Sequence, residues 1–308
     1  MSYYLRIPPT GEYLELWKIE LDLAVQIGVT NPERGAGTYF KADPGETIWE
    51  AIRRQTPWFE PDGENPFHRA GLQPGQYYPR IARPINFRRH DVPGFSPGAY
   101  DEVDLMAIAR SQLTVLTRQL DRICQTVHPT MQTFETFGHD IRNLLILACT
   151  EVEAHWRGVL AANGVRKDRY STNDYVGLLG AMKLDEYAVT FPSYPWLNAV
   201  QPYKDWGSTG KPTQDLRWYD SYNAVKHNRE AEFERATLRH VFEAISACMI
   251  MMAAQFGDDG IGRRSEVQSF FKFSALPDWS PSDVYIEPCD GPSQDWSPAF
   301  FNFGIKGA

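Results

Sequence analysis

The sequence has few of the residues that disulfide scaffolds and metal clusters need. It contains four cysteines in 308 residues, and no two of them are spaced like a metal knuckle or a redox pair. Cys124, Cys149 and Cys248 fall within apolar helical patterns, where cysteine behaves as a small hydrophobic residue. We therefore expect no metal site, no cofactor and a reducing compartment, the cytoplasm.

A hydrophobic run of membrane-spanning length is also missing. The longest apolar run extends from Ala244 to Phe256, is interrupted by Ser246 and Gln255, and is too short to cross a bilayer. The first residues have no apolar core of signal-peptide length. The sequence therefore predicts a soluble protein that makes no use of a membrane.

An excess of positive charge is absent too, because the net charge is -8. This balance excludes a protein that coats nucleic acid by bulk electrostatics, although it allows a local basic groove. The sequence also lacks a glycine loop followed by the lysine of a phosphate-cradling motif. One basic run stands out, interleaved with aromatic residues, and consists of Arg80, Arg83, Arg88, Arg89 and His90. It is a candidate nucleic-acid contact through phosphate binding and base stacking; alternatively, it pairs with the protein's own acidic surface.

Four long apolar patterns with helical spacing dominate the middle of the chain. They cover about 101–127, 130–163, 213–228 and 230–256, and a shorter helix begins near residue 172. The predicted fold class is therefore all-α, an up-and-down bundle of four to five helices.

The two flanks are expected to decorate this bundle. Residues 11–29 resemble an amphipathic helix whose apolar positions are Leu14, Trp17, Leu21 and Val25, and a short helix is expected to open at Asp43 with Glu46 at its capping-box position. Residues 57–98 are rich in proline and glycine, and residues 268–288 are expected to form a short strand pair. The predicted organisation is a decorating region over 1–100, the bundle over 101–257 and an extension over 258–308.

The segment from Tyr222 to Arg229 is unusual, because core helices seldom place an amide, an ammonium, an imidazole and a guanidinium so close together. At 100° per residue, Asp220, Asn223 and His227 share one face of the predicted helix, whereas Tyr222 is expected to face the core.

Four helices, an aromatic crossover and a helix that ends in Tyr-Asn-x-x-Lys-His together resemble the HEPN superfamily over about residues 101–257. The resemblance implies an all-helical, dimeric domain of toxin–antitoxin, phage-defence or RNA-processing systems. Active members are metal-independent endoribonucleases that carry Arg-x4–6-His, usually with a polar residue directly after the arginine. On this pattern His227 takes the histidine position and Asn223 the polar position, but Tyr222 stands where arginine is expected.

The resemblance assigns roles to a small set of residues. His227 is the expected base, and Lys226 or Arg229 is the expected cation that offsets charge on the phosphorane. Asn223 is the fourth candidate catalytic residue, since its amide can orient the imidazole one turn away. Tyr222 has a supporting role at the arginine position. The alternative is a solvated helix end whose cations favour the C-terminal dipole.

Helix geometry adds two supporting candidates, Asp220 one turn before Asn223 and Glu153, a carboxylate on a neighbouring helix that could cross the bundle to His227; alternatively, Glu153 lies on a solvated face and pairs with Arg157.

Three interpretations of function stay open at this point. The first is an endoribonuclease or a toxin derived from one. The second is a catalytically inactive HEPN-like protein that binds RNA or a protein partner such as an antitoxin. The third is a structural or regulatory helical homodimer.

Overall fold

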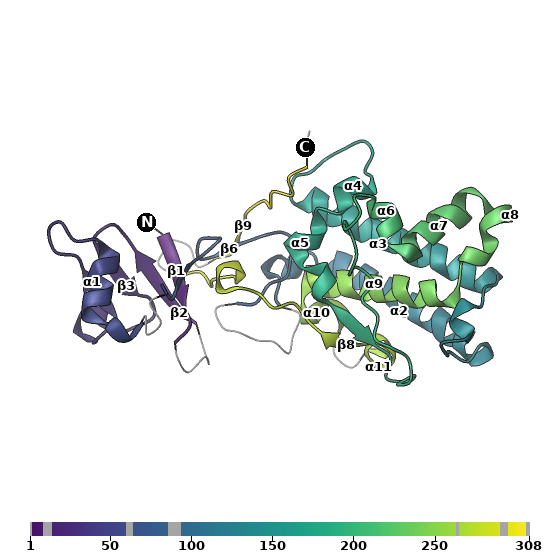
Figure 1. Ribbon diagram of the computed structural model, residues 1–308, viewed down its shortest axis with the longest axis horizontal. Coiled ribbons are helices and arrows are strands. Elements are labelled where there is room, and N and C mark those ends of the chain that lie inside the picture. The colour runs from purple at the N-terminus through teal and green to yellow at the C-terminus, as the bar shows by residue number, and fades with distance from the viewer. Residues whose placement is uncertain are drawn as a thin grey trace. The chain divides into compact units, whose positions relative to one another are not determined.

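The computed structural model of the chain describes residues 2–8, 14–59, 64–85, 94–262, 265–289 and 295–305. Figure 1 draws two compact units, which are described separately here. The first unit consists of Met1–Tyr77, Arg83–Arg89 and Trp279–Ser297. The second unit consists of Tyr78–Ala82, His90–Asp278 and Pro298–Ala308. The residues that follow 257 are thus divided between the two units.

The first unit contains a five-stranded sheet, so the prediction of an all-α chain is wrong and the protein is mixed α/β. Its strand order is β4-β3-β2-β1-β5, and all neighbours are antiparallel. The strands are β1 (Ser2–Arg6), β2 (Glu15–Ile19), β3 (Leu23–Gln26), β4 (Tyr39–Lys41) and β5 (Phe67–Arg69).

The expected helix over residues 11–29 is a β-hairpin within the described range, and one residue explains the error. Leu21 fits a helical stripe with Trp17 and Val25, but it lies in the turn between β2 and β3 and is 94% exposed. Trp17 and Val25 lie on different strands, where Trp17 pairs with Gln26. Alternation of buried residues at Trp17 and Ile19 is the strand signal that the helical spacing concealed.

Helix α1 (Ile48–Gln55) lies between β4 and β5 in sequence, and its buried residues Ile48, Ala51 and Ile52 join Trp17 and Phe40 in one core cluster. A second cluster joins strand β1 to the returning segment, through Leu5 and Ile286 among others. The second cluster explains why this unit includes residues from near the C-terminus.

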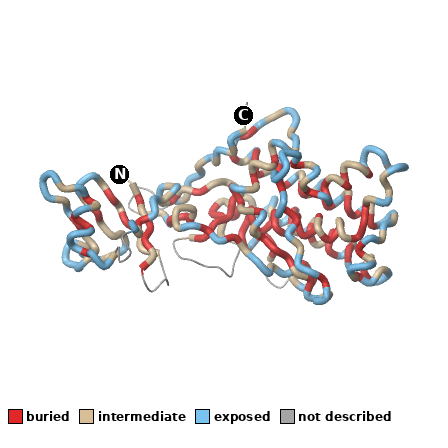
Figure 2. Tube along the Cα trace, in the orientation of Figure 1, coloured by how far each residue is buried: buried red, intermediate tan, exposed pale blue. Residues whose placement is uncertain are grey.

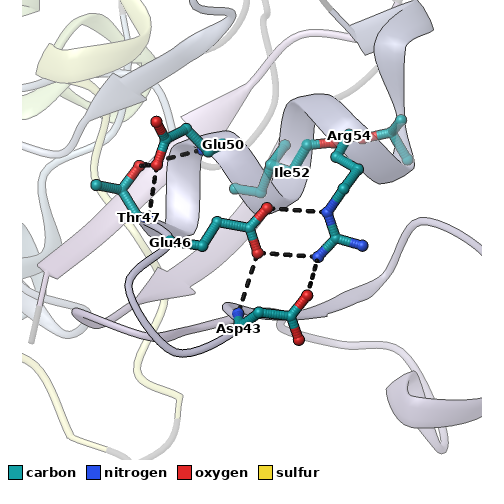
Figure 3. Close-up of polar contacts among 7 residues, drawn as sticks. Asp43, Glu46, Thr47, Glu50, Ile52 and Arg54 are labelled. Carbon is teal, nitrogen blue, oxygen red and sulfur yellow. Dashed lines mark hydrogen bonds and ion pairs between the residues drawn. The ribbon is translucent and has the colours of Figure 1, made fainter.

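A short helix after Asp43 was correctly expected, but its start was placed too early. The helix begins at Ile48, and the capping box is formed by Thr47 and Glu50 (Figure 3). Glu46 instead accepts hydrogen bonds from Arg54 at 2.9 Å, and this guanidinium also contacts Asp43.

The second unit contains the four long helices that the sequence predicts, with later starts for three of them. They are α2 (Val103–Thr126), α3 (His139–Ala162), α7 (Arg217–His227) and α9 (Leu238–Phe256). Helix α3 begins at His139 rather than near Thr130, because Thr130 and Thr133 bond each other's backbone amides and close a separate turn.

Helix α9 is the centre of the bundle. Every residue from Ala244 to Phe256 is buried, and the helix packs against α2, α3 and α7. Figure 2 shows many buried residues along the helices of this unit. A helix that is apolar on all sides is expected in such a central position.

The strand pair expected within 268–288 has a different partner. Strand β8 (Lys272–Ala275) pairs with β7 (Ala188–Thr190) in the second unit, whereas Tyr285 forms a bridge with Ile85 in the first. The remaining short elements are α4 (Thr172–Tyr175), α5 (Leu178–Met182), α6 (Pro212–Asp215), α8 (Arg229–Glu232), α10 (Asp258–Ile261), α11 (Glu266–Phe270), β6 (Gln76–Tyr77) and β9 (Ser297–Pro298).

Candidate functional site

The polar segment that the sequence singles out lies at the C-terminal end of α7. Tyr222 is buried as expected, Asn223 is half-buried, and Lys226 and His227 are exposed. Among the described residues, the imidazole of His227 has no hydrogen-bond partner. The side chain of Arg229 lies outside the described part of the structure. The outward position of His227 leaves it accessible, but no neighbour fixes its orientation.

Lys226 faces α3 rather than His227. Its Nζ donates a hydrogen bond to the Tyr222 hydroxyl at 2.8 Å, and this bond raises the pKa of Lys226, with a smaller contribution from the charge of Glu153. Glu153 does cross from α3 to α7, but it accepts its hydrogen bond from the Tyr219 hydroxyl. The Tyr219–Glu153 hydrogen bond joins α7 to α3, whereas the Lys226–Tyr222 bond lies within α7.

The basic run is divided between the two units. In the second unit, Arg80 donates to Oε1 of Gln255 at 2.9 and 2.6 Å. In the first unit, Arg83 is buried, donates to the Asp283 carbonyl at 3.0 Å and lies over the ring of Trp279. Arg88 and Arg89 lie outside the described residues. Both described arginines are engaged with protein groups, so they offer less to a phosphate than the sequence indicated.

His155 belongs to a buried polar chain that continues from Arg80. Because Oε1 of Gln255 accepts from Arg80, its Nε2 donates to Nδ1 of His155 at 2.9 Å, which leaves the ring proton on Nε2, 3.6 Å from Glu151. Burial, together with the smaller effect of the nearby Arg80 charge, lowers the pKa of His155 to about 3. His155 is therefore a neutral structural histidine at pH 7.

A second polar site lies between α7 and the start of α9. We call it the α7–α9 pocket; it has a volume of about 270 Å³. Its lining residues are Arg217, Asp220, Ser221, Arg235, Thr237 and His240. Only Asp220 was singled out from the sequence.

Arg235 and His240 are the residues that sequence reasoning missed. They are separated by four residues, which is a spacing that the HEPN resemblance specifies, although Ala236 stands where a polar residue is usual. The pair was overlooked because it spans a turn and a helix start instead of a helix end. The spacing alone does not single out this pair, because Arg122 and His128 also satisfy it; the pocket distinguishes Arg235 and His240.

One hydrogen bond fixes the tautomer of the neutral His240 ring. Its Nδ1 lies 2.9 Å from the carbonyl oxygen of Arg235, and because a carbonyl only accepts, Nδ1 carries a proton; in the neutral ring Nε2 is then an acceptor, and it has no partner among the described residues. Burial lowers the pKa of His240, and the bond to Arg235 opposes this only in part. The ring is therefore neutral at pH 7 and can accept a proton.

Of the two arginines that line the pocket, Arg235 forms ion pairs and Arg217 forms none with the described residues. Nη2 of Arg235 lies 2.5 Å from Asp220, and Nη1 lies 3.4 Å from Glu232. Arg217 is exposed, and the described residues offer it no ion pair. With two arginines and one aspartate, the lining has a net positive charge of one.

Within the described ranges, no group of three or more histidine, cysteine, aspartate or glutamate side chains is placed to hold a metal ion. The described helices include none that is both long enough and apolar enough to cross a membrane. Comparison with family models, with curated proteins and with solved structures finds no significant match for this chain.

Proposed function

We propose that the second unit binds RNA at the α7–α9 pocket and cleaves it in a metal-independent, HEPN-like reaction. The observation that carries this proposal is His240, a neutral imidazole whose Nδ1 proton is held by the Arg235 carbonyl and whose Nε2 is free to act as a base. The Arg-x4-His spacing of Arg235 and His240 supports the same function.

In the proposed reaction, Nε2 of His240 takes the proton of a ribose 2′-hydroxyl. The 2′-oxygen forms a bond to phosphorus, the bond from phosphorus to the 5′-oxygen breaks, and this oxygen takes a proton from the imidazolium or from water. The products are a 2′,3′-cyclic phosphate and a 5′-hydroxyl. Arg217 stabilises the charge that develops on the phosphorane oxygens.

The test is incubation of the full chain with mixed cellular RNA in excess EDTA. Wild type is expected to leave 2′,3′-cyclic phosphate ends, and His240→Ala to reduce the rate by about 10²- to 10⁴-fold, the usual contribution of a general base. His227→Ala is the matched control and is expected to keep its activity. Equal cleavage by wild type and His240→Ala would overturn the assignment, and loss in His227→Ala alone would move the site to the end of α7.

A second candidate, RNA binding without cleavage, is favoured by the environment of Arg235. This guanidinium is held by Asp220 and Glu232, so it is less available to a phosphate than Arg217. Retention of RNA at low salt with no cleavage in any variant is its expected signature. The resemblance further supports a homodimer or a protein partner such as an antitoxin. Light scattering of the purified chain measures the oligomeric state. The low cysteine content supports the cytoplasm as the location of the protein.

A further inference from the structure

Thr237 stands at the N-cap of α9 but does not act as a cap. A threonine at this position normally accepts a hydrogen bond from an amide in the first turn, yet here no such bond forms. The residue is 7% exposed, and its buried Oγ1 has no partner among the described residues. An unsatisfied buried hydroxyl is costly. Because Thr237 lines the α7–α9 pocket, a ligand in that pocket is the natural partner for its hydroxyl.

The first amides of α9 point to the same kind of ligand. The opening N–H groups of a helix have no acceptor within the helix. The amide of Leu238 donates to the Thr136 carbonyl at 2.9 Å, but the described structure provides no acceptor for the amide of His240, which lines the pocket. Because α9 is 19 residues long, its dipole adds positive potential at this end.

Side chains of α7 complete the surroundings of these donors. Ser221 is 3% exposed, lines the pocket and has no hydrogen-bond partner within the described residues. Arg217 lines the pocket from the same helix, and its charge is not consumed by an ion pair with any residue that the structure describes. The only carboxylate in the lining, Asp220, is neutralised by Arg235. Hydroxyls, a free amide and a free guanidinium together are the donors that a phosphate group selects.

We propose that the α7–α9 pocket holds a phosphate group, whose oxygens accept hydrogen bonds from the Thr237 hydroxyl and from the amide of His240, with Arg217 as the counter-charge. This inference deepens the proposed function, because it names the part of the substrate that the pocket holds. It does not require cleavage, since phosphate binding is measured separately.

The experiment uses the full chain and two probes, inorganic phosphate and a 2′-deoxy dinucleotide phosphodiester that has no 2′-hydroxyl to attack. Calorimetric titration is expected to show saturable binding of at least one probe. Thr237→Val, which keeps the shape but removes the hydroxyl, is expected to weaken binding by about tenfold, the value of one hydrogen bond to a charged group. Thr237→Ser is the matched control and is expected to bind as tightly as wild type.

Arg217→Gln provides a second, independent test, because an exposed side chain is not needed for folding. It is expected to weaken binding by about tenfold and to reduce the salt dependence of the affinity. Stronger binding of the dinucleotide identifies a polymer backbone as the source of the phosphate, and stronger binding of inorganic phosphate identifies a free or terminal one. Absence of binding by either probe, or equal affinity in wild type, Thr237→Val and Arg217→Gln, would overturn the inference. Phosphate binding without RNA cleavage would reject the proposed nuclease alone, and cleavage that does not depend on Thr237 would reject the phosphate assignment alone.

Discussion

Glu243 provides a direct test of the electrostatics at the start of α9. It lies one turn after Arg239 and is half-buried, and burial raises the pKa of its carboxyl from 4.5 to about 7, against the opposing charges of Arg239 and Arg217. A carboxyl whose folded pKa is raised stabilises the fold below its unfolded pKa, and this contribution is lost as pH rises through the folded pKa. The ionised carboxylate therefore destabilises the second unit above neutral pH.

The magnitude of this effect follows from the two pKa values. Replacement by a neutral isostere, Glu243→Gln, removes a cost of about 3 kcal/mol at pH 8 but less than about 1 kcal/mol at pH 5. The variant is thus expected to be more stable than wild type at pH 8 and nearly equal to it at pH 5.

Hydrogen exchange of the α9 amides is the appropriate assay, because it reports opening of the second unit alone. Comparing the variant with wild type at each pH cancels the intrinsic dependence of exchange on pH. Glu234→Gln is the matched control, since Glu234 is exposed, and it is expected to change nothing. A difference between Glu243→Gln and wild type that is the same at pH 5 and pH 8 would refute the reasoning.

Two further substitutions test local packing and capping. In Gly158→Ala, the added Cβ would clash with Nη1 of Arg80, so the guanidinium must leave Gln255. We expect the free energy of unfolding, measured with urea, to fall by about 1–2 kcal/mol. The matched control is Gly180→Ala, whose added Cβ meets nothing within 4 Å and which is expected to be neutral or slightly stabilising. Thr47→Ala removes the capping box of α1 (Figure 3) and is expected to cost about 1 kcal/mol. Arg54→Ala is expected to have a smaller effect at physiological salt, because the Arg54 side chain is half exposed and its ion pairs are screened. Equal effects of Gly158→Ala and Gly180→Ala would contradict the packing argument, and equal effects of Thr47→Ala and Arg54→Ala would contradict the capping argument.

The helices of the second unit were predictable because each buries a wide apolar stripe. Leu113, Leu116 and Leu120 in α2 are all at most 1% exposed, as their spacing predicts. The sheet of the first unit was not predictable in the same way, because its strands are short and one exposed leucine, Leu21, imitates a helical stripe. The contribution of residues 279–297 to that unit depends on contacts between distant parts of the chain, which no local pattern records.

The candidate site was likewise only partly predictable from the sequence. The end of α7 was conspicuous in the sequence because its polar residues are consecutive, but consecutive residues on a helix point in different directions. Lys226 bonds to Tyr222, whereas the imidazole of His227 has no hydrogen-bond partner in the described part of the structure. The α7–α9 pocket was inconspicuous because its residues come from two helices and a turn. Its defining feature, the unpartnered hydroxyl of Thr237, is an absence of a contact and has no sequence signature. Other buried donors of the described residues, such as the Ser246 hydroxyl and the Trp156 indole, also lack a partner, so Thr237 is distinguished by its place in the pocket lining and not by that absence alone.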